Sequence, residues 1–230
     1  RGVRMILAVT AGKGGVGKST VAYNLAAELD AVVVDADLGM ADLPGARGPD
    51  LHDVLAGRAS PLEAVRETGP VPILPCGRSL AGLRATEPAD LVEAVRTVAR
   101  QYGRVVIDSP AGMRSDAGLP LLAADGCVLV TRPTPTAVAD AVRARELARI
   151  LETPLVRVAL NRVQSTGSDE EANREHRLAT ELGAPVVRIP DSRTVARAQR
   201  AGRPVRALDA DAPAVTQFER LAAAVDRALG

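Results

Sequence analysis

The stretch GKGGVGKST at residues 12–20 limits the possible fold of this chain more than any other part of its sequence. Four of its nine residues are glycine, which permits backbone conformations that a side chain would hinder. The apolar run RMILAVT at 4–10 comes before it, and residues 19–29 repeat apolar side chains at helical spacing after it. We therefore expect a buried strand, a glycine-rich loop and a helix in direct succession.

Residues 12–19 match the pattern G-x-x-x-x-G-K-[ST], which binds phosphate groups when a strand precedes it and a helix follows. Successive backbone N–H groups of such a loop point at phosphate oxygens, and the helix adds its positive end. In this pattern Lys18 reaches the β and γ phosphates, Ser19 offers a hydroxyl to Mg²⁺ and Thr20 lies near the α phosphate. A glycine-rich turn without a ligand is the alternative. The predicted nucleotide-binding residues of the loop are Gly12, Lys13, Gly14, Gly15, Val16, Gly17, Lys18, Ser19 and Thr20.

Lysine occurs in this chain only at positions 13 and 18, although lysine and arginine together number 29. An ammonium group is compact and sits on a flexible stem, so a planar guanidinium does not replace it in every role. The phosphate-loop pattern explains Lys18 and leaves Lys13 unexplained. An ordinary solvated loop lysine is the alternative for Lys13.

Apolar runs alternate with helical patterns along the rest of the chain. Beyond the first strand and helix, strands are expected at 31–37, 71–77, 104–110, 126–131, 155–163 and 185–190. Helices are expected at 88–101, 136–151, 169–182, 192–201 and 213–229, with short helices and loop at 38–70. This alternation predicts an α/β fold of three layers, in which helices cover both faces of a mainly parallel sheet. No repeat or linker interrupts it, so residues 1–230 are expected to form a single P-loop domain.

Three aspartates lie at the ends of apolar runs. Asp35 and Asp37 close the run VVVDAD, and Asp108 closes VVID, which is the Walker B arrangement. Because ligands of parallel α/β sheets bind at the carboxyl ends of the strands, these carboxylates are expected near the phosphate loop and Mg²⁺. Each of them could instead cap a helix or belong to a loop. The predicted metal site consists of Ser19, Asp35, Asp37 and Asp108.

The signature K-G-G-V-G-K-S at residues 13–19 resembles that of the deviant Walker A ATPases, the MinD/ParA family. The similarity runs from Met5 to about residue 226 and is strongest to the MinD branch, through SPAG at 109–112 and TRPTPTAVADA at 131–141. The resemblance implies slow hydrolysis of ATP to ADP with Mg²⁺ and a homodimer that encloses two nucleotides. It implies that Lys13 reaches the phosphates bound by the other subunit.

The resemblance also assigns roles to residues near the phosphates. It implies that Asp37 orients the attacking water, so that Lys13, Lys18 and Asp37 are the predicted catalytic residues, and that Asp35 supports the Mg²⁺ shell. Asp42 stands where asparagine is common in the MinD branch, which is expected to affect regulation more than ATP binding. The predicted second switch region consists of Ser109, Pro110, Ala111 and Gly112, with the Gly112 N–H near the γ phosphate.

Two segments resemble those that flank the adenine base in this family. They are LNRV at 160–163 and IPDS at 189–192, and the predicted base-binding residues are Asn161, Arg162, Pro190 and Asp191. A strand-end asparagine and a Pro-Asp pair are also common in turns without any ligand, so both interpretations stay open.

The resemblance implies a switch in spatial positioning, such as placement of the division site, with a regulatory or activator protein as partner. ParA-type DNA partitioning and positioning of motility or chemosensory machinery are the alternatives. Residues 193–206 contain five arginines and no acid, which fits a solvated face, a protein-binding surface or DNA contacts. The apolar stripe of 213–229 is expected to pack on its own domain rather than on a membrane.

Composition excludes several other classes of protein. A net charge of +1 gives no general attraction to nucleic acid or anionic membranes. Cys76 and Cys127 are far apart and form no CxxC motif, which argues against a disulfide, a zinc site or a carried iron–sulfur cluster. No apolar run approaches the ~20 residues that span a bilayer, and no signal peptide is evident. With the family resemblance, this predicts a cytoplasmic protein that can lie at the membrane surface.

Overall fold

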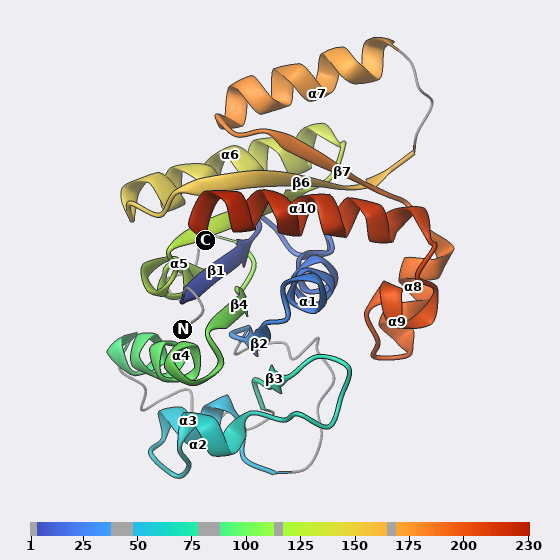
Figure 1. The fold of residues 1–230 in the computed structure, drawn as a ribbon. Helices are drawn as coiled ribbons and strands as arrows, with labels where there is room; N and C mark the ends of the chain where they lie inside the picture. Colours follow the sequence, from blue (N-terminus) through green and yellow to red (C-terminus); the bar gives the residue numbers. More distant parts are fainter. Residues whose placement is uncertain (1–3, 38–47, 78–87, 113–116, 165–168) are drawn as a thin grey trace.

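The computed structural model describes residues 4–37, 48–77, 88–112, 117–164 and 169–230. Within these ranges the strands form one seven-stranded sheet in the order β3-β2-β4-β1-β5-β6-β7 (Figure 1). Every strand pair in this sheet is parallel. The predicted parallel α/β fold is therefore confirmed.

The first five strands along the chain are almost continuously buried, as expected for a sheet that is covered on both faces, while the last strand is mostly half-buried. They are β1 Met5–Thr10, β2 Val32–Asp35, β3 Ile73–Leu74, β4 Arg104–Asp108, β5 Gly126–Thr131, β6 Leu155–Val163 and β7 Val186–Pro190. The helices are α1 Lys18–Leu29, α2 Leu51–Leu55, α3 Pro61–Ala64, α4 Pro88–Tyr102, α5 Gly118–Ala123, α6 Pro135–Ile150, α7 Asp169–Leu182, α8 Arg193–Arg200, α9 Val205–Leu208 and α10 Pro213–Leu229.

Helices cover both faces of the sheet and complete the three predicted layers (Figure 1). On one face Val9 of β1 shares a core with Val21 of α1 and Phe218 of α10. On the other face Ile107 of β4 packs with Val95 of α4. The α5, α6 and α7 helices extend that second layer over β5 and β6. Alternate side chains of a strand point to opposite faces, so each strand contributes to both cores.

The ends of several elements differ from the sequence prediction. The strand expected at 71–77 is reduced to β3, because only Val33–Ile73 and Val34–Leu74 pair with β2. Helices α5 and α9 were not predicted from the sequence. The six residues of α5 include a glycine and a proline, and α9 has only four residues. Both helices are therefore too short to show a helical period in the sequence.

The last helix uses its apolar stripe inside the protein. Val215, Phe218, Leu221 and Val225 of α10 are all buried, which confirms the predicted packing of this helix on its own domain. Among the helices that the structure describes, none combines the length and apolarity needed to cross a membrane.

Candidate functional site

The predicted site residues lie along the carboxyl edge of the sheet. The strand register places Asp108 at the end of β4 between Val9 of β1 and Asp35 of β2. Since β1 leads directly into the glycine-rich loop, the loop and both aspartates come together at the centre of this edge. The strand order therefore joins residues that are about a hundred positions apart in the sequence.

The loop has little room for side chains. A Cβ on Gly12 would lie 1.9 Å from the backbone oxygen of Asp140 on α6, and one on Gly17 would lie 2.1 Å from Nδ2 of Asn161. Gly17 also has a φ of 97° and precedes α1 without any side-chain cap. The first N–H groups of α1 therefore have no side-chain acceptor from Gly17, which is the arrangement that binds anions at helix N-termini.

Lys18 and Asp108 form a buried ion pair beneath the loop. The Nζ of Lys18 lies 2.5 Å from Oδ1 of Asp108, and the two side chains are 6% and 0% exposed. Burial raises the pKa of Asp108, while the charge of Lys18 and a hydrogen bond from Ser19 oppose that rise. Charges removed from water this completely are strongly destabilising unless each has a partner. The pair therefore keeps the site neutral when no other ion is bound.

Among the residues that the structure describes, three buried oxygen atoms at this edge have no hydrogen-bond partner. They are Oδ2 of Asp35, Oδ2 of Asp108 and Oγ of Ser109. Burial raises the pKa of Asp35 to about 8, and the neighbouring Asp108 carboxylate adds to this rise. Orphaned buried polar atoms are costly, and carboxylate and hydroxyl oxygens are the donors that Mg²⁺ prefers. These atoms therefore fit a hydrated magnesium ion beside the phosphate loop.

The acidic residues do not form a complete metal cage by themselves. No cluster of three or more His, Cys, Asp or Glu side chains suited to a metal occurs in the described part of the chain. Asp37 is half-buried just beyond β2, and its N–H donates to Oδ1 of Asp35 at 3.3 Å. Mg²⁺ usually takes only one or two carboxylates together with phosphate oxygens and water. The geometry thus suits an ion that arrives with a phosphorylated ligand.

Lys13 contacts the start of α6 in its own chain. Its Nζ donates to Oγ1 of Thr136 at 3.0 Å and lies 4.0 Å from Oδ2 of Asp140. Asp140 also pairs with Arg143 at 2.5 Å, so its carboxylate is shared between two cations. The side chain of Lys13 is 37% exposed, in contrast to Lys18. In this structure Lys13 therefore points away from the buried pair.

The predicted base-binding residues lie at the ends of β6 and β7, which are adjacent strands. Asn161 is buried and donates from Nδ2 to the carbonyl of Val16 at 2.8 Å, and its Oδ1 accepts from the N–H of Arg162. Arg162 is exposed and has a positive φ of 56°. The N–H of Asp191 donates to the carbonyl of Val163 at 3.0 Å, and the Asp191 side chain is exposed. Pro190 is half-buried beside these residues.

The predicted second switch region follows β4 directly. The N–H of Ser109 donates to the carbonyl of Val9, and the N–H of Gly112 donates to that of Ala11 at 3.1 Å. Pro110 and Ala111 lie between these two bonds. The Gly112 N–H, expected near the γ phosphate, thus has a backbone acceptor here. Asp42 lies outside the described residues.

A family model described as the CobQ/CobB/MinD/ParA nucleotide binding domain matches residues 7–205. The chain belongs to this family. The family expected from the K-G-G-V-G-K-S signature is thereby confirmed.

Individual relatives of this MinD/ParA-family chain agree with that assignment. An uncharacterized ATP-binding protein of Methanocaldococcus jannaschii is 31% identical over 94% of this chain and 86% of its own length. The cell division ATPase MinD of Pyrococcus furiosus has a TM-score of 0.86 and 26% identity, covering 98% of this chain and 100% of that one. The septum site-determining protein MinD of Pyrococcus horikoshii, solved with Mg-ADP, has a TM-score of 0.85 and 26% identity, with 98% and 97% coverage.

Some contacts of this MinD/ParA-family site were not predicted. The stretch 131–141 contributed to the resemblance, but its pattern did not indicate that Thr136 and Asp140 contact Lys13. A helix that starts with Thr134 as cap directly after β5 was the available signal, since it places the first turn of α6 at the carboxyl edge. Nor did the pattern indicate that the thiol of Cys76 contacts Asp37.

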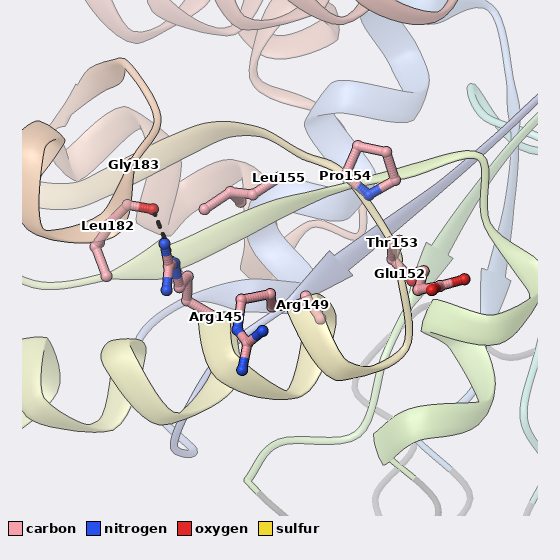
Figure 2. A pocket seen from close by; sticks show the side chains of 9 residues that line it. Arg145, Arg149, Glu152, Thr153, Pro154, Leu155, Leu182 and Gly183 are labelled. Atoms are coloured by element: carbon pink, nitrogen blue, oxygen red, sulfur yellow. Dashed lines mark hydrogen bonds between the residues drawn. The ribbon is translucent and has the colours of Figure 1, made fainter.

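A separate cleft of about 330 Å³ lies at the amino edge of the sheet, where β6 begins and α6 and α7 end (Figure 2). Its arginines are already engaged, because Nε of Arg145 donates to the carbonyl of Leu182 and both Arg145 and Arg149 pair with Glu146. The predicted nucleotide-binding residues all lie at the other edge. This cleft is therefore unrelated to the candidate site of the MinD/ParA-family domain.

Proposed function

We propose that this chain is a MinD-like ATPase whose single domain, residues 1–230, binds ATP with Mg²⁺ and hydrolyses it slowly. The observation that supports this most is the buried Lys18–Asp108 pair, with three orphaned oxygens beside it, under a helix start that has no side-chain cap. A cation and a phosphate together would supply the missing partners. Mg-ADP in the MinD of Pyrococcus horikoshii agrees with this choice of ligand.

In this proposal different residues bind the phosphates, the metal ion and the base. The N–H groups of the loop and of the first turn of α1 bind phosphate oxygens, and Lys18 turns from Asp108 toward the β and γ phosphates. Ser19, Asp35 and Asp108 hold the Mg²⁺ ion, directly or through water. When bound, this ion neutralises charge on the phosphate oxygens and helps to orient them. Asn161, Arg162, Pro190 and Asp191 border the base.

Hydrolysis requires a positioned water molecule at the γ phosphate. Asp37 is the proposed orienting residue, because it follows β2 at the same edge as the phosphate loop. P-loop switches hydrolyse nucleotide slowly until an activator completes the site. We therefore propose that a regulatory protein accelerates this ATPase, and that its cycle serves spatial positioning in cell division or a related process.

Lys13 is the proposed link between two subunits. Its contacts with Thr136 and Asp140 are exposed, and exposed ion pairs contribute ~0–1 kcal/mol. The lysine can therefore leave α6 for the phosphates of a second subunit at little cost. ATP would then stabilise a homodimer, and hydrolysis would release it.

Light scattering after size-exclusion chromatography tests this proposal, with ATP·Mg²⁺ and with ADP·Mg²⁺. The native chain is expected to dimerise with ATP only, and Lys13→Arg is expected to bind ATP as a monomer. Arg143→Lys is the matched control, because it alters the other cation beside Asp140 and should dimerise normally. A native chain that binds ATP and remains monomeric would contradict the dimer, and absent phosphate release would contradict the ATPase.

A second candidate function is ATP-dependent DNA binding of the ParA type. Arg193, Arg197, Arg200 and Arg203 are exposed, and no ion pair to them occurs among the described residues. Arg206 differs, because it pairs with Glu28 of α1 at 2.6 Å. Unpaired arginines on one surface suit the phosphates of a nucleic acid.

A further inference from the structure

Three chain segments meet beside Asp37 at a buried junction. The thiol of Cys76 donates to the backbone carbonyl of Asp37 at 3.2 Å, and its sulfur lies 3.9 Å from Nε2 of His52. Cys76 is 0% exposed and His52 is 2% exposed. We call Asp37, His52 and Cys76 the buried junction.

The backbone holds His52 and Cys76 in fixed positions relative to each other. The N–H of Leu51 donates to the carbonyl of Pro75 at 2.8 Å, and the N–H of His52 donates to that of Cys76 at 3.3 Å. Gly77 has a φ of 92°, and a Cβ there would lie 2.3 Å from the carboxylate of Asp50. The α2 helix is thus seated tightly against the segment that follows β3.

The donor and acceptor roles within the buried junction follow from the single proton of the thiol. The Cys76 thiol has one proton, which it donates to Asp37, so its sulfur can only accept from His52. His52 then carries its proton on Nε2, and the buried Nδ1 without a partner is a lone pair rather than an orphaned donor. Burial and the nearby carboxylates of Asp35, Asp37 and Asp50 raise the pKa of the thiol, which keeps this proton in place at neutral pH.

Asp37 lies just beyond the end of the sheet, where bonds with two other segments fix the backbone. The Ala36 N–H makes a bond to the carbonyl of Asp108, and β2 itself ends at Asp35. The N–H of Asp37 donates to Oδ1 of Asp35 at 3.3 Å. The bond from Cys76 is made to the carbonyl of Asp37, so the N–H and the carbonyl of this residue are both held.

We propose that Cys76, oriented by His52, is a positioning residue that fixes the backbone of Asp37 and thereby aims its carboxylate at the hydrolytic water. This inference rests on the proposed ATP hydrolysis. The junction lies outside the phosphate loop, so it affects the rate of hydrolysis and leaves ATP affinity unchanged. Small displacements of an orienting group are sufficient to slow a reaction substantially.

The test compares Cys76→Ala, which removes the donor, with Cys76→Ser, which keeps an O–H donor. We expect kcat to fall about tenfold in Cys76→Ala, the upper range for one hydrogen bond, and to recover largely in Cys76→Ser. Affinity for a non-hydrolysable ATP analogue should stay within about twofold in both, because the binding groups are untouched. His52→Phe, which keeps a ring without the donor, should lower kcat in the same direction.

Cys127 provides the matched control. It is also a free cysteine with 0% exposure, but it packs among apolar side chains at the middle of the sheet. Cys127→Ala and Cys127→Ser should leave kcat unchanged. With Cys127→Ala as background, Cys76 is the sole thiol, and its S–H stretch in the infrared should lie at a lower frequency than that of an unbonded thiol.

The outcomes separate this inference from the proposed function. A native chain that hydrolyses ATP, loses hydrolysis in Asp37→Ala and keeps full kcat in Cys76→Ala would overturn the positioning role alone. Equal losses in Cys76→Ala and Cys76→Ser would show a packing effect and also overturn it. A native chain that does not hydrolyse ATP would overturn the proposed function, because the activity would then be missing before any substitution. If Cys76→Ala does not fold, Cys76→Val fills the space without a donor and replaces it.

Discussion

At the scale of single residues, the site is a set of charges that burial makes costly. Lys18, Asp35 and Asp108 are each 6% exposed or less. One positive and two negative groups share this space, and only Lys18 and Asp108 form an ion pair. Burial, with the neighbouring Asp108 carboxylate, raises the pKa of Asp35 to about 8, so its protonated form is favoured at neutral pH.

The raised pKa of Asp35 predicts a pH dependence of stability. Its folded-state pKa of about 8 exceeds the ordinary value of 3.8, so the folded protein binds more protons than the unfolded chain between these values. The contribution of Asp35 to the free energy of unfolding is fully present at low pH and is lost as the pH rises toward 8. Between pH 5 and pH 8 this loss is on the order of 3 kcal/mol. Thermal unfolding without nucleotide at pH 5 and pH 8 measures this loss.

Asp35→Asn should remove most of that pH dependence, since the amide imitates the protonated carboxyl group. It should be more stable than the native chain at pH 8. Asp211→Asn, which changes an exposed aspartate before α10, is the control and should keep the native pH dependence. An Asp35→Asn variant with the native slope between pH 5 and pH 8 would show that other groups cause it.

At the scale of elements, the close approach of the phosphate loop to α6 is the most demanding contact. Gly12 lies against the backbone of Asp140, whereas a Cβ on Gly14 would meet no atom within 4 Å. Two glycines of one loop thus differ in what a methyl group would meet. This difference separates steric need from the general flexibility of glycine.

Gly12→Ala is therefore expected to destabilise the protein by about 1–3 kcal/mol, because the loop or α6 must move. Gly14→Ala should change the free energy of unfolding by less than about 0.5 kcal/mol, since the added methyl group enters open space. Urea unfolding of both variants without nucleotide measures these effects. Equal destabilisation by the two substitutions would refute the steric argument.

The sequence predicted most of the secondary-structure elements, but it did not predict the contacts that join them at the site. The phosphate loop, the helix after it and the succession of strands and helices along the chain were predictable, because each follows from local residue patterns. The Lys18–Asp108 pair, the contact of Lys13 with Thr136 and the bond from Cys76 to Asp37 join positions 90, 123 and 39 residues apart. The first two depend on the insertion of β1 between β4 and β5, and the third depends on the pairing of β2 with β3, which no periodicity within one segment encodes.

At the scale of the whole molecule, the near-neutral net charge conceals an uneven distribution of charge over the surface. The segment that contains α8 and α9 lies on the side of α1, the helix that begins at the phosphate loop (Figure 1). Tyr23 donates from its hydroxyl to the carbonyl of Gly202, and Asn24 accepts from the N–H of Val205 at 2.7 Å. These bonds attach the arginine-bearing segment to α1, the helix that follows the phosphate loop.

If the second candidate function is correct, this surface binds DNA when ATP is present. Changing Arg193, Arg197 and Arg200 together to Gln should lower the slope of log affinity against log salt by about 3, close to 0.9 per lost phosphate contact. Arg143, Arg149 and Arg174 changed to Gln form the control, because these exposed arginines already pair with acids. Equal DNA affinity of both triple variants, measured by fluorescence anisotropy, would exclude this role.

The buried ion pair of Lys18 and Asp108 has a consequence for how the protein would exchange charges when it binds its proposed ligand. Each of the two buried charges has the other as its counter-ion, so neither is left unpaired in the interior. In the proposed function, binding would resemble ion exchange: phosphate would replace the carboxylate at the lysine, and a metal would replace the lysine at the carboxylate. Each of these two charges would pass from one partner to another without being left unmatched in the interior.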